Sequence, residues 1–174
     1  SSTSIYDAAA NAAATSQSNN TANLNERIAP TIASTSINPG SSALTVTFSE
    51  NVYDTSGGTG DLEAADFALS IAGGSATLGS ATPTSITKTS QSVWVLGFST
   101  TGTANGSETI TVVPASSTSI YDAAANAAAT SQSNNTANFN DVSAPTIDST
   151  SINSSNSALT VTFSENVYDT SGGT

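Results

Sequence analysis

The chain contains no cysteine, histidine or methionine among its 174 residues. Without cysteine there is neither a disulfide framework nor a thiolate metal site, and without histidine there is no imidazole ligand and no ordinary proton shuttle. A Ser-His-Asp or Cys-His arrangement would lack its general base. The sequence therefore predicts a protein that is not an enzyme and has no catalytic residues.

Basic residues are almost as scarce. Arg27 and Lys88 stand against thirteen acidic residues, which gives a formal net charge of -11. Such a chain repels phosphate backbones and anionic membrane surfaces, so we expect neither nucleic acid nor a membrane as its partner. No apolar run approaches the roughly 20 residues that a membrane-spanning helix needs, so we do not expect membrane insertion either.

The strongest feature that is present is an internal repeat. Residues 1–59 recur as residues 116–174, an offset of 115 residues, with eight substitutions. The substituted pairs are Leu24/Phe139, Glu26/Asp141, Arg27/Val142, Ile28/Ser143, Ala33/Asp148, Pro39/Ser154, Gly40/Ser155 and Ser41/Asn156. A period of this length is too long for a solenoid unit and suits one autonomous domain. We therefore expect a tandem array of similar domains.

The phrase Ala-Pro-Thr-Ile, at Ala29 and again at Ala144, marks where each domain begins. Proline cannot continue a strand ladder, and a rigid extended linker suits a domain junction. The sequence thus predicts one complete repeat with its linker over residues 29–141. Residues 1–28 are predicted to be the C-terminal part of a preceding repeat, and residues 142–174 the N-terminal part of a following one. We expect the chain to be a segment of a longer polypeptide or polymer.

Within the complete repeat, apolar residues alternate with polar ones as they do in short strands. Residues 43–48 place Leu, Val and Phe on one face, and residues 93–98 and 108–112 alternate likewise. Turn-forming pairs such as Gly57-Gly58, Gly73-Gly74 and Asn105-Gly106 separate these runs. About seven short strands in about 110 residues predict an all-β sandwich.

Two segments have helix-forming composition but are brief. Residues 122–129 are rich in alanine, yet they lack an apolar stripe, so we expect a loop with room for one helical turn. Residues 61–66 are predicted to form a single turn capped by Asp61, just before a strand that begins at Phe67.

Several motifs follow one another in order through the repeat. They are Ala-Pro-Thr-Ile from Ala29, Val-Thr-Phe-Ser-Glu-Asn-Val over 46–52, Ala-Asp-Phe-Ala-Leu over 65–69, Thr-Ile-Thr-Val over 109–112 and Ile-Tyr-Asp-Ala-Ala-Ala-Asn over 120–126. This order resembles the immunoglobulin-like repeats of large bacterial surface adhesins, in which the last motif usually reads Asp-x-x-Gly-Asn and Ala125 here replaces the glycine. The resemblance implies a sandwich fold, a cell-surface or matrix location, and tandem copies that act as spacers or adhesive units, often stiffened by calcium.

Other chemical motifs are weak. Ser85-Ile-Thr-Lys88 matches the S-x-x-K pattern of penicillin-recognising enzymes, but it lies in a strand-like stretch without the companion motifs. A glycosidase needs two carboxylates that face each other across a cleft, and no cleft is predicted at the carboxylates between Asp61 and Asp66. Lys88 is the only lysine, and a surface position is favoured over an isopeptide crosslink to asparagine.

Acidic residues are concentrated in loops that an immunoglobulin-like sandwich brings to one end. Because calcium takes six to eight oxygen ligands and would relieve the repulsion among these carboxylates, we predict a calcium site there. The predicted ligands are Glu50, Asp66 and Asp122, with Asp54, Asp61 or the linker residue Glu26 completing the shell; the corresponding set in the next repeat begins with Asp141, Glu165 and Asp169. Glu108 is expected at the opposite end. The alternative is a solvated acidic loop cluster that serves solubility.

Taken together, these features predict an extracellular or cell-surface structural and adhesive rod. Its partners would be neighbouring repeats of the same protein and other copies in a filament. The alternatives are a ligand-binding adhesive module and a carbohydrate binder. A carbohydrate binder should display exposed aromatic rings, whereas Trp94, the only tryptophan, lies in a strand predicted to be in the core.

Overall fold

Alternating threonine and apolar residues form the central strands of the protein. The structure is a computed structural model that describes residues 5–172. Strand β2 (Ala43–Phe48) buries Leu44, Val46 and Phe48 and leaves its threonines half-exposed, as predicted for a half-buried strand. Strand β6 (Val93–Gly97) likewise buries Trp94 and Leu96.

Two antiparallel sheets build the complete repeat. The first has the order β1-β2-β6-β5, with β1 at Ile32–Ile37 and β5 at Ser85–Ser90. The second has the order β3-β8-β9. Its strands are β3 (Phe67–Ala72), β8 (Thr109–Pro114) and β9 (Thr136–Asn138). Two short strands, β4 (Thr77–Leu78) and β7 (Thr100–Thr101), pair separately.

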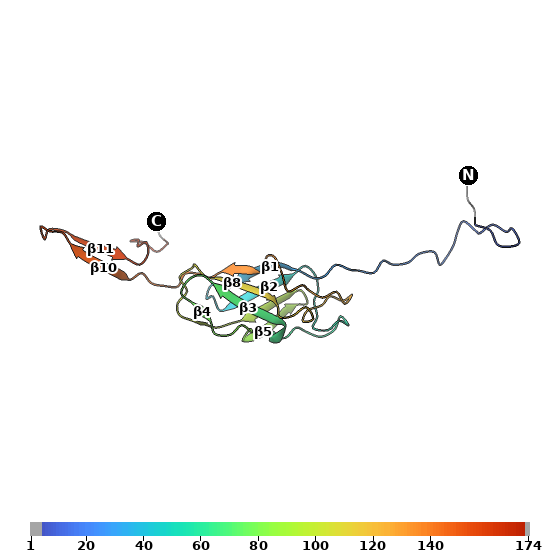
Figure 1. Ribbon diagram of the computed structural model, residues 1–174, viewed down its shortest axis with the longest axis horizontal. Helices are drawn as coiled ribbons and strands as arrows, with labels where there is room; N and C mark the ends of the chain where they lie inside the picture. The colour runs from blue at the N-terminus through green and yellow to red at the C-terminus, as the bar shows by residue number, and fades with distance from the viewer. Residues whose placement is uncertain (1–4, 173–174) are drawn as a thin grey trace.

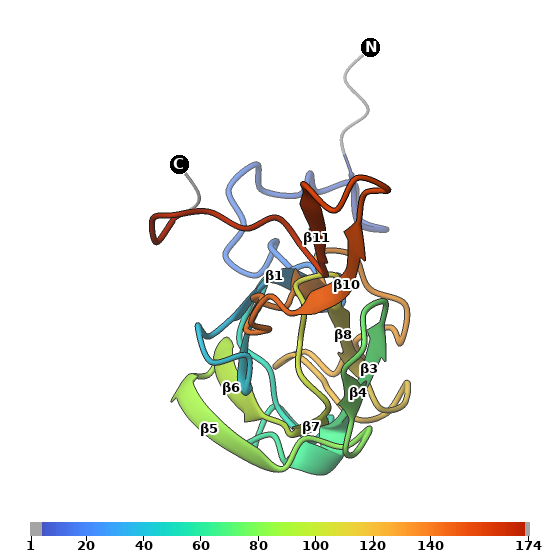
Figure 2. The same ribbon diagram turned by 90° about the vertical axis from the view of Figure 1, so that its left-hand side faces the viewer.

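The core lies between these two sheets, which face each other in the view along the long axis (Figure 2). Two aromatic pairs join the layers: Phe48 packs against Phe67 with ring centroids 6.3 Å apart, and Phe98 against Phe139 at 5.7 Å. The all-β prediction is confirmed, and the arrangement is that of a sandwich. The seven strands of the two sheets match the predicted number, with β4 and β7 as an additional pair.

One local prediction is confirmed and another needs a correction. Residues 122–129 form the predicted loop, without a helical turn, because the Asp122 carboxylate accepts hydrogen bonds from the backbone N–H groups of Ala124 and Asn126. The predicted turn before β3 exists as a 3-10 helix, η1 (Ala64–Asp66), but its N-cap is Glu63 and not Asp61. Asp66 accepts a hydrogen bond from the Glu63 N–H at 2.7 Å, so the turn starts two residues further along the chain than a turn capped by Asp61 would.

The end segments extend away from opposite sides of the sandwich (Figure 1). Residues 5–28 run out from one side and are exposed. On the other side, β10 (Ile147–Ile152) and β11 (Leu159–Phe163) form a separate hairpin with the same register as β1 and β2, including the irregularity after the first pair. Across residues 5–172, no helix is long and apolar enough to cross a membrane.

Candidate functional site

Asp122 anchors the loop between β8 and β9. Its side chain is 1% exposed. Oδ1 accepts hydrogen bonds from the N–H groups of Ala124 at 2.8 Å and Asn126 at 2.7 Å, and Oδ2 accepts one from Asn126 Nδ2 at 2.7 Å. Burial alone would raise the pKa of Asp122, but these donors outweigh it and hold the pKa below its ordinary value. The carboxylate is therefore ionised and fixed in direction.

The same loop occurs in the N-terminal segment without any sandwich around it. Asp7 Oδ1 accepts from the N–H groups of Ala9 and Asn11, both at 2.9 Å, and Oδ2 accepts from Asn11 Nδ2 at 2.9 Å. Ala10 has a φ of 66°, close to the 71° of Ala125. Because the geometry is retained in an exposed segment, the loop is determined by its own sequence. Only its burial depends on the rest of the fold.

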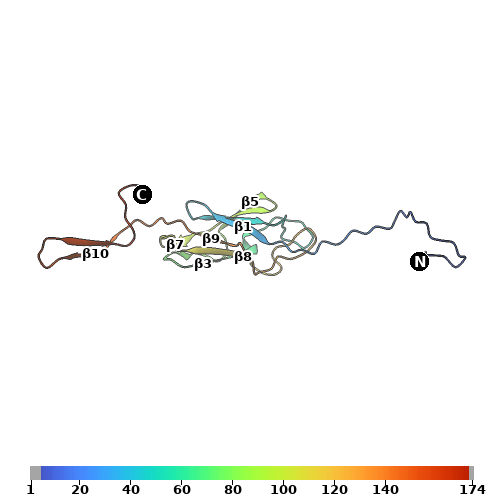
Figure 3. The same ribbon diagram turned by 90° about the horizontal axis from the view of Figure 1, so that it is seen from above.

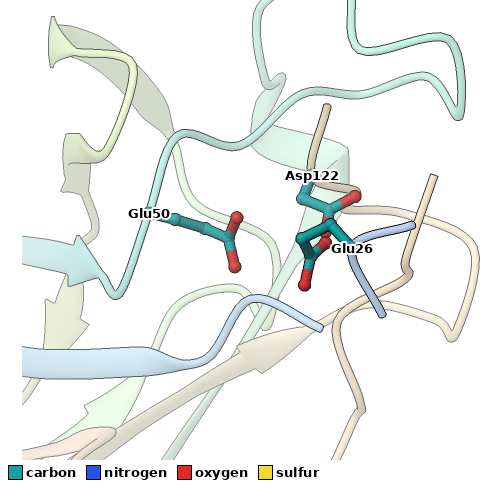
Figure 4. A group of neighbouring side chains, drawn as sticks. All are labelled: Glu26, Glu50 and Asp122. Carbon is teal, nitrogen blue, oxygen red and sulfur yellow. The ribbon is translucent and has the colours of Figure 1, made fainter. Parts of the chain in front are cut away.

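Glu50 follows β2 and is brought to Asp122 by a backbone bridge. Tyr53 and Tyr121 exchange two N–H to carbonyl hydrogen bonds, each 2.8 Å long, which hold the loop after β2 against the Asp122 loop. Glu26 arrives from the linker, where its Oε2 accepts a hydrogen bond from Asn126 Nδ2. Carboxylate oxygens of Glu26, Glu50 and Asp122 all lie within 4.8 Å of one another and converge on one space (Figure 4).

We call this cluster the linker triad (Glu26, Glu50 and Asp122). Its negatively charged carboxylates repel one another. The pKa of Glu50 is raised by burial and, after that, by the negative charges of Asp122 and Glu26. Protonation or a cation would relieve this repulsion. Three converging carboxylates are a donor set that suits a hard cation such as calcium, with backbone carbonyls or water completing six to eight ligands.

Asp54 and Asp66 form a second group of acidic side chains. Burial raises the pKa of Asp66, and the charges of Asp54 and Glu63 add to this effect, while the bond from the Glu63 N–H opposes it. Oδ1 of Asp54 is buried and has no hydrogen-bond partner within the described residues. Gly60 makes room for Asp54, because a Cβ at that position would overlap its carboxylate.

Asp61 lies beside a positively charged side chain of the protein. It forms an ion pair with Lys88, whose ammonium also lies 5.6 Å from the centre of the Trp94 ring. Lys88 is a surface residue of strand β5, and the Ser85–Lys88 match lies in that strand and not at the start of a helix. Strand β5 therefore brings a positively charged side chain to the acidic loops.

The predicted ligands of the next repeat lie at the other end of the sandwich. Asp141 forms an isolated backbone bridge with Asn105, so the second linker docks on that end. Asp141 and Glu165 both line a cavity of about 500 Å³ between the sandwich and the β10–β11 hairpin. Asp169 is exposed.

No protein-family model, curated protein or solved structure matches the chain.

Glu108 is a buried carboxylate with a structural role that the sequence did not predict. It lies at the end that carries the second linker and is 0% exposed. Its carboxylate accepts hydrogen bonds from the N–H groups of Ser75 at 2.8 Å, Ala76 at 3.0 Å and Asn105 at 3.1 Å. Burial would raise its pKa, but these three donors lower it below the ordinary value. Its sequence signal was its alternation with Ile110 and Val112, which places all three on the inner face.

Proposed function

We propose that this protein is a repeat unit of an extracellular structural and adhesive rod, with no enzymatic role. The observation that carries the proposal is the duplication of residues 1–59 at an offset of 115 residues. The linkers that precede and follow the complete repeat leave from opposite sides of it (Figure 3). Repeats joined in this way add length with each copy, which is what a spacer requires.

The order of the strands supports an immunoglobulin-like fold. Constant-type immunoglobulin domains have one sheet in the order A-B-E-D and a second in the order C-F-G. Taking β1, β2, β3, β5, β6, β8 and β9 as A to G, the two sheets of this protein have the same orders. The duplicated hairpin β10–β11 would begin the next such domain.

We also propose that calcium binds the linker triad and stiffens the junction between repeats. Glu26 belongs to the linker, whereas Glu50 and Asp122 belong to the sandwich, so a shared cation would fix one to the other. The equivalent linker residue, Asp141, also carries a carboxylate, although its neighbours differ between the two copies.

The calcium proposal is tested by thermal unfolding of the full chain at increasing calcium concentrations. A ligand at 100 times its dissociation constant adds about 2.7 kcal/mol to the free energy of unfolding, so the melting temperature should rise with calcium. Glu50→Gln should abolish most of this rise. The control Asp148→Asn removes one charge from an exposed site on β10 and should keep the full calcium response.

If the melting curve is the same with and without calcium, the proposed cation site is contradicted, but the proposal of a rod is not affected. The rod has a separate test, which is the size of the native polypeptide on a denaturing gel. A species far larger than 17.2 kDa, or a ladder of such species, is expected, and a single native product of 17.2 kDa would contradict it.

The alternative of a carbohydrate-binding module is less favoured. Sugar-binding surfaces use exposed aromatic rings. Trp94 is 1% exposed and is held by a hydrogen bond from its indole N–H to the carbonyl of Gln91 at 3.2 Å. The adhesive role is therefore assigned to the array and not to an aromatic platform on this repeat.

A further inference from the structure

The second linker is held by the backbone of the complete repeat that precedes it. We call residues 104–107, between β7 and β8, the end loop. Asn105 of the end loop and Asp141 of the linker form an antiparallel backbone bridge. Beside this bridge, the Val142 N–H donates a hydrogen bond to the Ala104 carbonyl at 3.0 Å. The linker is therefore attached to this end of the sandwich through main-chain groups.

Two further features fit the end loop to the linker. Ser143 Oγ donates a hydrogen bond to the Ala104 carbonyl at 3.1 Å. Gly106 has a φ of 78°, and a Cβ at this position would lie 3.2 Å from the Asp141 Cβ, so the glycine allows the linker to approach closely. The preceding repeat thus holds the chain as far as Ser143.

These backbone contacts are compatible with variation in the linker sequence. Three of the substitutions between the two copies fall at residues 141–143, where the first linker has Glu26, Arg27 and Ile28. The bridge and the Val142 N–H bond use main-chain atoms, which every residue except proline supplies. The Val142 side chain itself is 56% exposed. Docking of this kind is therefore available to both linker sequences.

A few residues later the chain is held again, this time by the repeat that follows. The Thr146 N–H donates to Ser164 Oγ, and the Ser164 N–H donates to the Thr146 carbonyl, both at 2.9 Å. The complete repeat has the same two bonds between Thr31 and Ser49, at 3.0 and 2.8 Å. Pro30, just before Thr31, is buried there. A complete repeat therefore holds its own chain from this proline onward.

One residue remains between the two sets of contacts. It is Ala144, the counterpart of Ala29, in the segment that joins the sandwich to the β10–β11 hairpin (Figure 1). Pro145 follows it and disfavours the helical region for its backbone, which keeps it extended. We propose that each junction of the array bends only at this alanine, and that the linker moves as part of the preceding repeat whether or not a cation is bound.

This inference goes beyond the proposed rod, because the protein's own contacts limit the motion of the junction without calcium. It also explains what the linker carboxylate can do. Glu26 is the counterpart of Asp141, whose backbone the preceding repeat holds, and Glu26 Oε2 accepts a hydrogen bond from Asn126 of the sandwich that follows. A residue at this position has its backbone on one repeat and its side chain on the next, so a cation bound there would restrict the remaining motion at the alanine.

The experiment is amide hydrogen exchange of the full chain, measured by NMR with a calcium chelator present. The first linker is an internal control, because the chain contains no counterpart of the end loop for it. After correction for intrinsic rates, the Val142 N–H should exchange more than about tenfold more slowly than the Arg27 N–H. Backbone order parameters should match those of the sandwich through Ser143 and decrease first at Ala144.

Gly106→Ala tests the end loop directly. The added methyl group meets Asp141, so the Val142 N–H should exchange as fast as the Arg27 N–H. Gly102→Ala is the matched control, because Gly102 has a φ of 87° and its added Cβ would lie 3.1 Å from a backbone oxygen of another loop and not against the linker. It should keep the protection. Retained protection in Gly106→Ala, or equal loss in both variants, would contradict the role of the end loop.

Two further results would overturn the inference. If the Val142 N–H of the unmodified chain exchanges as fast as the Arg27 N–H in the chelator, the end loop does not hold the linker. Should added calcium then slow this exchange, the cation site stands and only the present inference fails. If the order parameters decrease before Ser143, or stay high through Thr146, the junction does not bend at the alanine.

Discussion

At the scale of single residues, the Asp122 loop contains a strained backbone conformation that a single substitution could relieve. Ala125 has a φ of 71°, in the left-handed region where an L-residue with a side chain costs about 1–2 kcal/mol. The hydrogen bonds of Asp122 to Ala124 and Asn126 hold the strained conformation.

Ala125→Gly should therefore stabilise the complete repeat. Relief of the strain exceeds the extra chain entropy that glycine adds to the unfolded state, so we expect a gain of about 0.5–1 kcal/mol in the free energy of unfolding. Denaturant unfolding followed by Trp94 fluorescence would measure it. Ala10→Gly is the matched control: Ala10 has the same backbone conformation in an exposed segment, so its replacement should leave that transition unchanged. A loss of stability in Ala125→Gly would mean that the alanine methyl contributes more than the strain costs.

At the scale of elements, the two hairpins separate what is local from what is not. Both close through an asparagine whose Oδ1 accepts two backbone N–H groups, Asn38 in the first and Asn153 in the second. The fourth turn residue changes from Ser41 to Asn156 and keeps a positive φ, 48° and 52°. Turn and register are therefore fixed by local sequence, whereas burial differs completely.

The same truncation in the two hairpins should thus have unequal effects. Leu44 is 0% exposed in β2, and Leu44→Ala should cost about 2–5 kcal/mol of unfolding free energy. Leu159 occupies the equivalent place in β11 but is 64% exposed, so Leu159→Ala should leave the Trp94-detected transition unaltered. Equal effects in the two variants would show that the C-terminal hairpin is part of the same folding unit.

At the scale of the whole molecule, the acidic side chains act on stability in opposite directions. Glu50 and Asp66 have raised pKa values, so the folded protein takes up their protons more readily than the unfolded chain and becomes more stable as pH falls from neutral. Glu108 and Asp122 have lowered pKa values. Their contribution is complete above the ordinary values of 4.5 and 3.8, and it is lost as pH falls through the lower values of the folded state.

Stability without calcium should consequently pass through a maximum in mildly acidic solution, above about pH 4.5, and fall steeply below it. Glu108→Gln should make the loss of stability below about pH 4.5 less steep. It should also cost about 1–3 kcal/mol at neutral pH, because an amide N–H replaces an oxygen that accepts a buried backbone N–H. Asp148→Asn, at an exposed position, should keep the wild-type profile. Melting temperatures measured from pH 3 to pH 8 would reveal the maximum, and a monotonic curve would contradict this distribution of pKa values.

The sequence by itself determined the local architecture. Alternation of Thr with Leu, Val and Phe specified β2 because a strand turns successive side chains to opposite faces, and the same parity specified β6 and β8. The duplication at 115 residues marked off the complete repeat, and the Asp122 loop and the two asparagine turns form wherever their few residues occur. The Asp122 loop and the asparagine turns depend on hydrogen bonds between residues at most about five positions apart, so the local sequence is enough to determine them.

Only the tertiary structure decided which charges meet. Glu26 and Asn126 are 100 residues apart in sequence, and their contact depends on how the linker, the β2 loop and the Asp122 loop converge at one end of the sandwich. In the sequence, Asp61 is one of several acidic residues in the loops. The pairing of β5 with β6 positions Lys88, and Asp61 forms an ion pair with it. Nothing in the sequence distinguishes the environments of Glu108 and Asp148. In the structure, Glu108 accepts hydrogen bonds from three backbone N–H groups, whereas Asp148 is exposed to solvent. The energy of a charge is set by burial and by distant partners, and these exist only once the sheets have packed.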